Sequence, residues 1–286
     1  MADEGIICCI DILGYQNIIN TNQIEYVSNL ISDTISTIPK NVQEIVGNYF
    51  KDAVVGTDHL KESVEAVDFL NKKIKYLSIS DTILVSLSMK DFAKPSGFEE
   101  TTIATVEMTA WILYLVNIAT LQRIYFDAGL PVRGAIAYGE FYISENNFAG
   151  KPIIDSYVQA QKLNFSGCAL TVQCGELMLA KIAKWSDLLQ NDTFKMFDGL
   201  LVPYSAPLKG SSYKRLLLVD WLNNSVKNAS DIPQDIGQYI NTAFHDHNKE
   251  IDDTVISKIE NTERILRWMK EKKWKLTKDS LEQHSA

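Results

Sequence analysis

The chain has 286 residues, of which 46% are hydrophobic and 22% charged, and its formal net charge is −8. This length and composition are those of an ordinary globular protein with a sizeable core. The negative charge argues against a nucleic-acid-binding surface, because neutralising phosphates needs clustered Lys and Arg. The acidic start, Met-Ala-Asp-Glu-Gly, is unlike a signal peptide, and the longest apolar run is shorter than the ~20 residues of a membrane span. We therefore expect a cytoplasmic protein without a stable membrane span.

Four cysteines are present, and they form no CxxC motif. Cys8 and Cys9 lie within a continuous apolar run, where a free cysteine behaves as a small hydrophobic residue. We expect these two, together with Cys168 and Cys174, to be reduced core thiols rather than disulfides or metal ligands.

The first half of the chain alternates between strand-like runs and segments with an apolar residue every three or four positions. The pattern predicts, in order, a strand at 5–12, a helix at 22–38 ended by Pro39, a helix at 60–71, a hairpin of strands at 73–79 and 82–88, a loop at 90–100 and a long helix at 101–128.

The second half continues the alternation. It predicts strands at 132–138 and about 140–145 joined tightly at Gly139, a turn at 146–152, a helix at 153–164, a strand at 168–173, a helix at 175–189, strands at 200–203 and 215–220, and a helix at 236–273. The order up to residue 189 is that of a ferredoxin-like α+β core with additions. We expect a catalytic core at 1–175 and a C-terminal extension at 176–286 packed on it as one structural unit.

Two aspartates follow strand-like segments. Asp11 comes directly after five apolar residues, and Asp81 lies at the turn between two short β-branched segments. A buried strand that ends in a carboxylate tends to deliver it to a cleft or a cation, because an unpaired buried charge is costly. The alternative is that Asp11 caps a helix beginning near Tyr15 and that Asp81 is an ordinary turn residue.

Three motifs resemble those of class III nucleotidyl cyclases. Ile-Asp-Ile-Leu-Gly-Tyr at 10–15 resembles their first-strand signature, and Ile-Ser-Asp at 79–81 resembles their hairpin Gly-Asp, with Ser80 where Gly is usual. Val-Arg-Gly-Ala-Ile-Ala-Tyr-Gly at 132–139 resembles their fourth-strand motif. The motifs occur in the family's order and spacing over roughly residues 5–175. Together they look most like the pyrimidine cyclases of bacterial Pycsar anti-phage systems.

This resemblance implies a cytoplasmic enzyme that converts UTP, or next CTP, to the 3′,5′-cyclic monophosphate and pyrophosphate, as a defence signal read by a separate effector protein. It implies two Mg²⁺ or Mn²⁺ ions held by Asp11, Asp81 and the carbonyl oxygen of Ile12, since hard cations prefer oxygen ligands. The ions neutralise the triphosphate and activate the ribose 3′-hydroxyl. It also implies a homodimer whose composite sites join the aspartates of one chain to residues near 147–162 of the other.

Nucleotide contacts follow from the same resemblance. The turn Leu13-Gly14-Tyr15 leads into a helix and would offer backbone N–H groups to phosphates. In the purine branches, the position of Leu77 carries Lys for adenine or Glu for guanine, and a leucine can pair with neither. The second base-selecting position falls at Asn147 or Phe148, and an asparagine has a donor and an acceptor for a pyrimidine edge.

One family feature is missing. The Asn and Arg that steady the transition state have no counterpart here, since the nearest positions are Asp155 and Gln159. Lys162, Lys151 and Arg133 are candidates for the missing cation, and Arg133 suits a structural role equally well. Two alternatives to an enzyme therefore stay open: an inactive nucleotide-sensing module with the same fold, and a structural protein in which both aspartate motifs are core and cap features.

Overall fold

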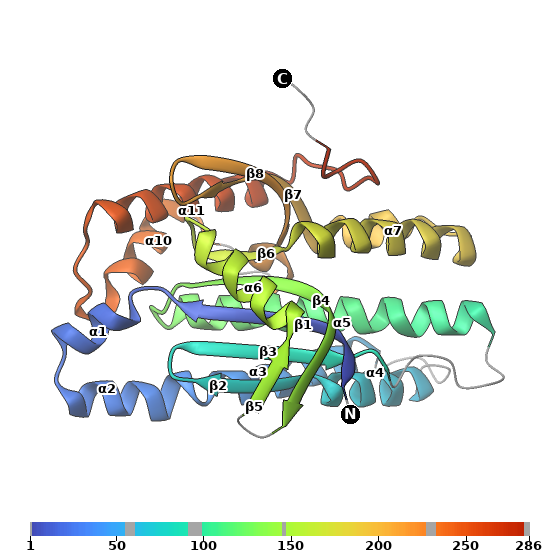
Figure 1. The fold of residues 1–286 in the computed structure, drawn as a ribbon, viewed down its shortest axis with the longest axis horizontal. Coiled ribbons are helices and arrows are strands. Elements are labelled where there is room, and N and C mark those ends of the chain that lie inside the picture. Colours follow the sequence, from blue (N-terminus) through green and yellow to red (C-terminus); the bar gives the residue numbers. More distant parts are fainter. Residues whose placement is uncertain (1, 55–60, 91–98, 145–146, 227–232, 283–286) are drawn as a thin grey trace.

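One mixed sheet organises the chain (Figure 1), with strands in the order β2-β3-β1-β4-β6-β8-β7 and with β5 paired to β4. The computed structural model describes residues 2–54, 61–90, 99–144, 147–226 and 233–282. Every neighbouring strand pair except β4–β6 is antiparallel. The predicted α+β class with a mostly antiparallel sheet is confirmed. The strands are β1 (Asp3–Ile12), β2 (Lys75–Ile79), β3 (Thr82–Ser88), β4 (Val132–Ser144), β5 (Asn147–Gly150), β6 (Gly167–Leu170), β7 (Leu201–Leu208) and β8 (Ser212–Val219).

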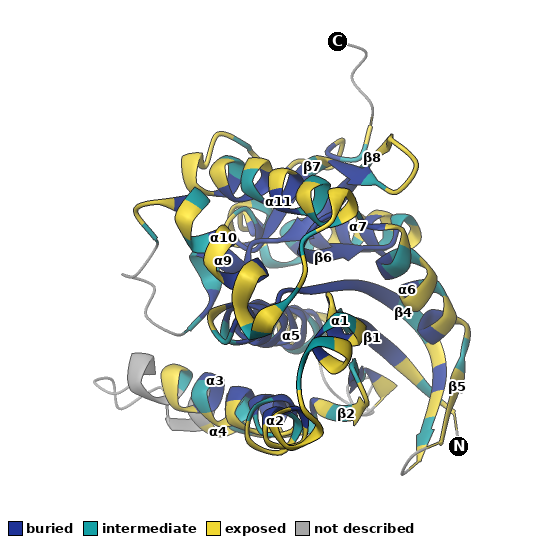
Figure 2. Cartoon of the chain, turned by 90° about the vertical axis from the view of Figure 1, so that its left-hand side faces the viewer, coloured by how far each residue is buried: buried dark blue, intermediate teal, exposed yellow. Residues whose placement is uncertain are grey.

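The helices cover both faces of this sheet. Figure 2 shows buried residues concentrated on the strands and on α5, with exposed residues on the outer surfaces of the other helices. The helices are α1 (Tyr15–Thr21), α2 (Ile24–Leu30), α3 (Ile38–Val54), α4 (Lys61–Lys73), α5 (Glu100–Asp127), α6 (Lys151–Lys162), α7 (Val172–Leu189), α8 (Thr193–Phe197), α9 (Trp221–Asn224), α10 (Ile236–His245) and α11 (Asp253–Glu271), with a π turn at Ile31–Ile35 and a 3-10 turn at Asp246–Asn248.

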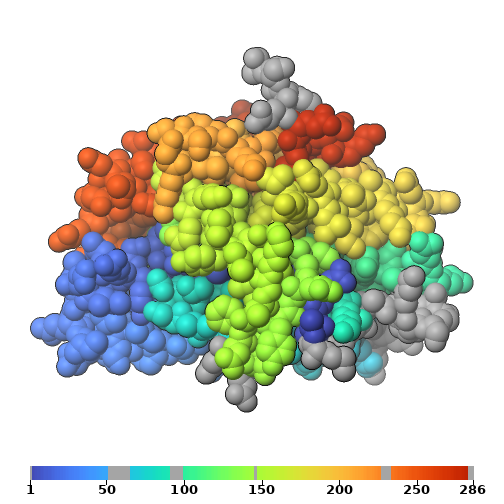
Figure 3. Space-filling model, viewed as in Figure 1, coloured from blue at the N-terminus to red at the C-terminus, as the bar shows by residue number. Residues whose placement is uncertain are grey.

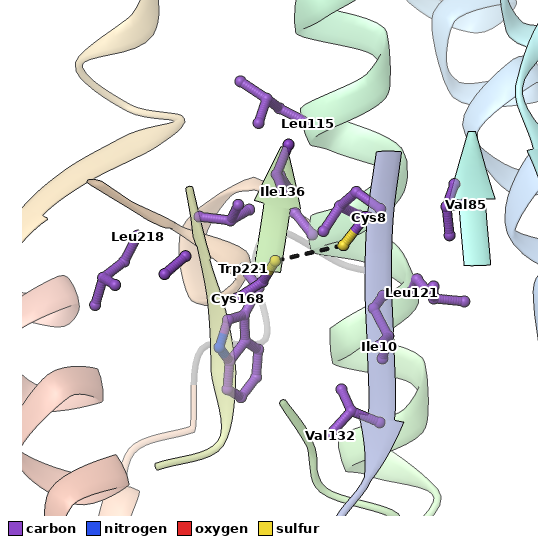
Figure 4. Packing of buried hydrophobic residues seen from close by; sticks show 14 of the residues in the cluster. Cys8, Ile10, Val85, Leu115, Leu121, Val132, Ile136, Cys168, Leu218 and Trp221 are labelled. Carbon is purple, nitrogen blue, oxygen red and sulfur yellow. Dashed lines mark hydrogen bonds between the residues drawn. The ribbon is translucent and has the colours of Figure 1, made fainter. Parts of the chain in front are cut away.

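The central strand β1 is buried on both faces, as its unbroken apolar run predicts. Cys8 and Ile10 point into the main core with α5 (Figure 4), whereas Ile7 and Cys9 pack in a smaller cluster with Ile153 of α6. Successive strand residues point to opposite faces. Asp11 therefore continues the row of Ile7 and Cys9 and faces the α6 side of the sheet.

All four cysteines are free and buried, as expected. The Sγ atoms of Cys8 and Cys168 lie 3.6 Å apart across the core (Figure 4). Burial raises the pKa of the Cys9 thiol to about 12, so this sulfur stays protonated and behaves as an apolar side chain.

Helix α5 packs in the main hydrophobic core of the protein. Among the described residues it is the one helix long and apolar enough to cross a membrane, and 61% of its most apolar window is buried inside the fold. Its polar groups find partners there: the Tyr114 hydroxyl donates to the carbonyl oxygen of Val85 at 2.8 Å. By length and composition this helix passes the test for a span, although most of its apolar window is buried, and the expected absence of a stable membrane span stays a prediction.

Two helix expectations were wrong in part. Residues 24–35 are helical, as α2 and the π turn, but a turn at 36–37 divides the helix expected at 22–38, and Pro39 does not end it. Pro39 is instead the second residue of α3, where its missing N–H costs no helical hydrogen bond. The helix expected at 236–273 is likewise divided, because His247 and Asn248 adopt left-handed φ values of 58° and 56°, which no α-helix accommodates.

The expected break at Gly139 was also wrong. Residues 132–144 form one continuous strand, β4, in which Gly139 pairs with Gly5 of β1. Beyond β1, the outer half of β4 pairs with β5 to form a two-stranded arm, where the sequence predicted only a turn. Most of the loop expected at 90–100 lies outside the described residues.

The C-terminal extension joins the core sheet. Strand β8 pairs with β6 at Ala169 and Leu218, and β7 continues the sheet beyond it. Helix α7 begins at Val172 and so crosses the expected boundary at residue 175. The division into a core and an extension stays a prediction.

One buried acid of the extension allows a stability test. Asp220 is fully buried at the start of α9, where its Oδ1 accepts the backbone N–H of Asn223 at 3.1 Å. Burial raises its pKa from 3.8 to about 6. Between these values the folded state binds more protons than the unfolded state, so the free energy of unfolding falls as the pH rises.

We expect Asp220→Asn to change the free energy of unfolding at pH 7 by less than about 1 kcal/mol, because removing a buried charge is offset by losing the Oδ2 acceptor of the Asn223 side-chain N–H at 2.7 Å, while the Oδ1 acceptor for the cap is kept. Urea denaturation from pH 4 to 7 should show a flatter pH dependence than in the wild type. The exposed cap Asp192 of α8 gives the control Asp192→Asn, which should leave that slope unchanged. An unaltered slope in Asp220→Asn would contradict the assignment.

Candidate functional site

Asp11 is held by a nearly buried polar contact at the end of β1. Its Oδ2 accepts hydrogen bonds from Nε and Nη2 of Arg133, at 3.0 and 2.8 Å, and from Nε2 of Gln161 at 3.2 Å. The side chains of Arg133 and Asp11 are only 9% and 13% exposed. Arg133 lies directly opposite Asp11 in the β1–β4 register, and Gln161 comes from α6. In this arrangement Arg133 is the counter-charge of Asp11.

Asp81 lies in the tight turn between β2 and β3. Ser80 before it has a left-handed φ of 57°, which explains why a glycine suits this position better. The carbonyl oxygen of Asp81 accepts the N–H of Ile12 at 3.1 Å, and Asp11 lies opposite Thr82 in the β1–β3 register. These contacts bring the two predicted aspartates to neighbouring strand ends.

A cavity of about 410 Å³ opens beside this turn. Asp81 and the turn of residues 12–15 line one side, and residues 244–258 of the C-terminal extension line the other. Asp11 is not part of this lining. The cavity therefore joins one aspartate and the predicted phosphate turn to a part of the chain that the sequence motifs did not include.

Lys249 crosses that turn. A Cβ atom on Gly14, whose φ is +78°, would lie 3.2 Å from Cδ of Lys249, so a glycine gives this side chain room. The Lys249 Nζ donates to the carbonyl oxygens of Gly129 and Ala243, at 2.7 and 2.9 Å. Burial lowers the Lys249 pKa to about 8. Lys249 thus ties the extension to the turn that carries the motif.

The expected backbone donors are only partly available. Leu13 lines the cavity, but its N–H donates to the carbonyl oxygen of Pro131 at 2.8 Å, and its role as a phosphate donor stays a prediction. Gly14 and Tyr15 line the cavity and remain candidates. Ile12 also lines it, and its carbonyl remains a predicted ligand.

The two predicted base-selecting residues lie far apart. Leu77 is half-buried on the α6 side of the sheet, packed against the cluster that contains Cys9. Asn147 begins β5, opposite Ser144 near the tip of the arm. Along β4, Ser144 is roughly 36 Å from Arg133 at the usual strand rise. Asn147 therefore cannot share a site with Asp11 of its own chain.

Helix α6 carries the positions of the missing Asn and Arg. Asp155 accepts a hydrogen bond from Lys151 one turn away on the same helix. Within the described part of the chain, Nε2 of Gln159 is buried without a hydrogen-bond partner. Lys162 is exposed at the end of the helix. Of the three predicted cations, Arg133 is the one that contacts Asp11.

The predicted metal ligands are all oxygen atoms. Two carboxylates and a backbone carbonyl are the oxygen ligands that Mg²⁺ and Mn²⁺ prefer. In the described ranges no group of three or more His, Cys, Asp or Glu side chains converges, and Asp11 does not line the cavity that Asp81 and Ile12 line, so a cation held by this set stays a prediction. Because Arg133 and Gln161 occupy Oδ2 of Asp11, a cation would bind the other oxygen or displace Arg133.

Several of these residues had no signal in the sequence. Gln161, Lys249 and Lys258 belong to no motif, and each reaches the site through a contact with a distant part of the chain. The spacing of apolar residues predicts a helix near Gln161, but it does not show that this helix, α6, lies over the end of β1.

Comparison with solved structures gives distant similarities, among them two bacterial adenylyl cyclases. No family model and no curated protein match the sequence. The adenylyl cyclase CyaB from P. aeruginosa is 12% identical, with a TM-score of 0.33, over 77% of this chain and 94% of that one. A bacterial light-regulated adenylyl cyclase is 10% identical, with a TM-score of 0.32, over 94% of this chain and 57% of that one. Similarities this low assign neither a family nor an activity to the chain.

Proposed function

We propose that the chain is a nucleotidyl cyclase that converts a pyrimidine nucleoside triphosphate, UTP before CTP, to its 3′,5′-cyclic monophosphate and pyrophosphate. The observation that supports this proposal is the bond between the Ile12 N–H and the Asp81 carbonyl, which fixes Asp11 and Asp81 at neighbouring strand ends. The adjoining cavity of about 410 Å³ is in the size range of small-molecule sites.

The proposed reaction joins the ribose 3′-oxygen to the α-phosphorus, and pyrophosphate leaves. Two Mg²⁺ or Mn²⁺ ions, when bound, would supply charge neutralisation and activation of the hydroxyl. Asp11, Asp81 and the Ile12 carbonyl would hold them. If a cation replaces Arg133 at Asp11, the freed guanidinium can donate two parallel hydrogen bonds to phosphate oxygens. Arg133 would then hold Asp11 in place before substrate arrives and bind the anion afterwards.

We also propose a homodimer with composite sites. Exposed apolar side chains gather on the arm and on α6: Tyr142, Phe148, Ile154, Tyr157 and Val158. Figure 3 shows both segments on the face toward the viewer, in the yellow-green part of the colour range. Phe148 pairs with Ile143 on the α6 side of the arm, whereas Tyr142 pairs with Ala149 on the opposite face. Exposed apolar side chains on the α6 side suit a partner subunit. Because Asn147 lies so far from Asp11 of its own chain, its proposed role requires the other chain's site.

Product identity tests the function and the base preference together. We expect a mixture of ATP, GTP, CTP and UTP at equal concentrations with Mn²⁺ to give mainly cyclic UMP, followed by cyclic CMP, as measured by mass spectrometry. Leu77 can neither donate a hydrogen bond to a purine edge nor accept one, so the polar groups of a bound purine would lack partners there. Apolar contact alone distinguishes one base from another by only ~1–3 kcal/mol. The preference against purines should therefore exceed the preference between the pyrimidines.

Each outcome of this experiment has a distinct meaning. Cyclic AMP or cyclic GMP as the main product would overturn the pyrimidine preference. Cyclic CMP as the main product would overturn only the preference for UTP over CTP. Nucleotide binding without pyrophosphate release would favour the inactive sensing module. The absence of the family's transition-state Asn and Arg at the positions of Asp155 and Gln159 is the observation that supports this alternative. The Asp81→Asn protein is the control for contaminating cyclases.

The role in anti-phage defence rests on the sequence resemblance. We propose that the cyclic nucleotide is a cytoplasmic signal read by a separate effector protein. Cells that carry the chain with that effector should lose protection against phage when Asp81→Asn replaces the wild type.

A further inference from the structure

Two lysines from separate elements lie near enough to Arg133, the partner of Asp11, for its charge to act on them. Arg133 comes from β4, Lys209 from the turn between β7 and β8, and Lys258 from α11. Burial lowers the pKa of Lys258, and the charges of Arg133 and Lys209 lower it further, against the opposing charge of Asp252. The pKa of Lys209 is lowered by burial and then by Arg133, and is raised by Asp11. The two lysines therefore add positive charge beside the ion pair of Arg133 and Asp11, and they repel each other.

Lys258 borders two cavities. It lines the 410 Å³ cavity that contains Asp81 and Gly14, and also a second cavity of about 670 Å³. The second lining includes Lys209 and side-chain hydrogen-bond donors from Ser211, Ser212, Asn164 and Asn261, together with one acid, Asp253.

The contacts of Lys258 leave it able to bind a ligand. Its Nζ donates to the carbonyl oxygen of Thr254 at 2.9 Å, and an ammonium group has three donors. The nearby acid Asp252 is engaged in capping α11, where it accepts the N–H of Val255 at 2.9 Å and the Thr254 hydroxyl at 2.7 Å. Repelling cations held beside a cavity are stabilised when an anion binds among them.

We propose that Lys258 of the C-terminal extension binds the polyphosphate of the substrate, together with Lys209 and Arg133 of the same chain. The inference rests on the proposed function, because the anion it assigns to this cluster is the triphosphate of that substrate. It gives helix α11 a direct role in substrate binding. Removing one charge-assisted contact should weaken binding of the anion without changing the fold.

The test measures binding of inorganic tripolyphosphate to the full chain by calorimetry at low salt, where exposed charges are least screened. We expect Lys258→Gln to weaken binding about tenfold, since one charge-assisted hydrogen bond of this kind is lost. Lys258→Arg, which keeps the charge, should stay close to the wild type. The matched control is Lys40→Gln, at an exposed lysine of α3 that lines neither cavity, and it should bind like the wild type.

Wild-type affinity in Lys258→Gln would overturn the proposal. A structural role is tested separately by the melting temperature, which should not fall in Lys258→Gln because the change relieves repulsion between cations. A lower melting temperature with equal losses in Lys258→Gln and Lys258→Arg would also overturn it.

Assays with UTP separate this inference from the proposed function. In an active enzyme, Lys258→Gln should raise the KM for UTP more than it lowers kcat. Normal turnover with an unchanged KM in Lys258→Gln would support the proposed cyclase activity and contradict the proposed anion site. Tripolyphosphate binding that depends on Lys258 in a protein that forms no cyclic nucleotide would support the anion site and contradict the cyclase activity.

Discussion

Asp11→Asn and Asp81→Asn should each lower cyclic nucleotide formation roughly a hundredfold or more, a loss of about 2.7 kcal/mol of transition-state stabilisation. Each change removes one negative charge from the pair that we propose to hold the divalent cations. The triphosphate then stays under-neutralised, and the 3′-hydroxyl is not activated. The measurement is kcat with saturating UTP and Mn²⁺.

The two variants should differ in stability while matching in activity. Asp11 is the buried counter-charge of Arg133, so Asp11→Asn should lower the free energy of unfolding by about 1–3 kcal/mol. Asp81 lies in a turn and is half-buried, so Asp81→Asn should change it by no more than about 0.5 kcal/mol. Equal activity losses with unequal stability losses would show that the activity does not follow from unfolding.

Controls make this comparison decisive. Asp187→Asn, at an exposed position of α7, should keep wild-type activity and stability. The double variant at positions 11 and 81 should be about as inactive as either single one, because groups that act as a unit lose their effect together. More than about a tenth of wild-type activity in either single variant would exclude the two-metal assignment, since the expected loss is far larger.

The local sequence pattern was enough to predict the strands that hold Asp11 and Asp81. The apolar run before Asp11 predicted a strand buried on both faces, and alternation along it puts Asp11 on the α6 side. The β-branched segments around Asp81 predicted the hairpin that the structure shows at 75–79 and 82–88. Both predictions depend on short-range periodicity, which strand pairing preserves.

Long-range contacts were beyond such reasoning. The register that places Arg133 opposite Asp11 joins residues 122 positions apart, and the contact with Gln161 spans 150. Lys258 reaches the site only because α11 packs beside the β7–β8 turn, and no motif marks it. Such contacts depend on how whole elements pack, which the spacing of apolar residues does not specify.

The errors have a similar origin. Glycine and proline often interrupt elements, so Gly139 was interpreted as a turn and Pro39 as a helix end. In the fold, Gly139 pairs in a continuous strand and Pro39 falls in the first turn of α3, where proline is tolerated. The same residue type thus serves two roles, and its position within the element decides between them.

The composite site predicts that two inactive chains can restore each other. One chain carries Asp11→Asn, and the other carries Asn147→Ala with Gln159→Ala, at the arm tip and at the unpartnered amide of α6. In a closed two-fold dimer of these chains, one site has both defects and the other has neither. Co-expression with two affinity tags and tandem purification should therefore give about half of wild-type activity per dimer.

A second mixed dimer supplies the control. Asp11→Asn paired with Asp81→Asn damages the aspartate pair of both sites, so this combination should stay inactive even though both chains assemble. Light scattering must show a dimer in each preparation, because the exposed apolar side chains of Ile154, Tyr157 and Val158 on α6 are expected to be covered by the partner. If the first heterodimer is no more active than its parent homodimers, each site is built within one chain. Asn147, which lies at the tip of the arm far from Asp11 of its own chain, would then have no part in choosing the base.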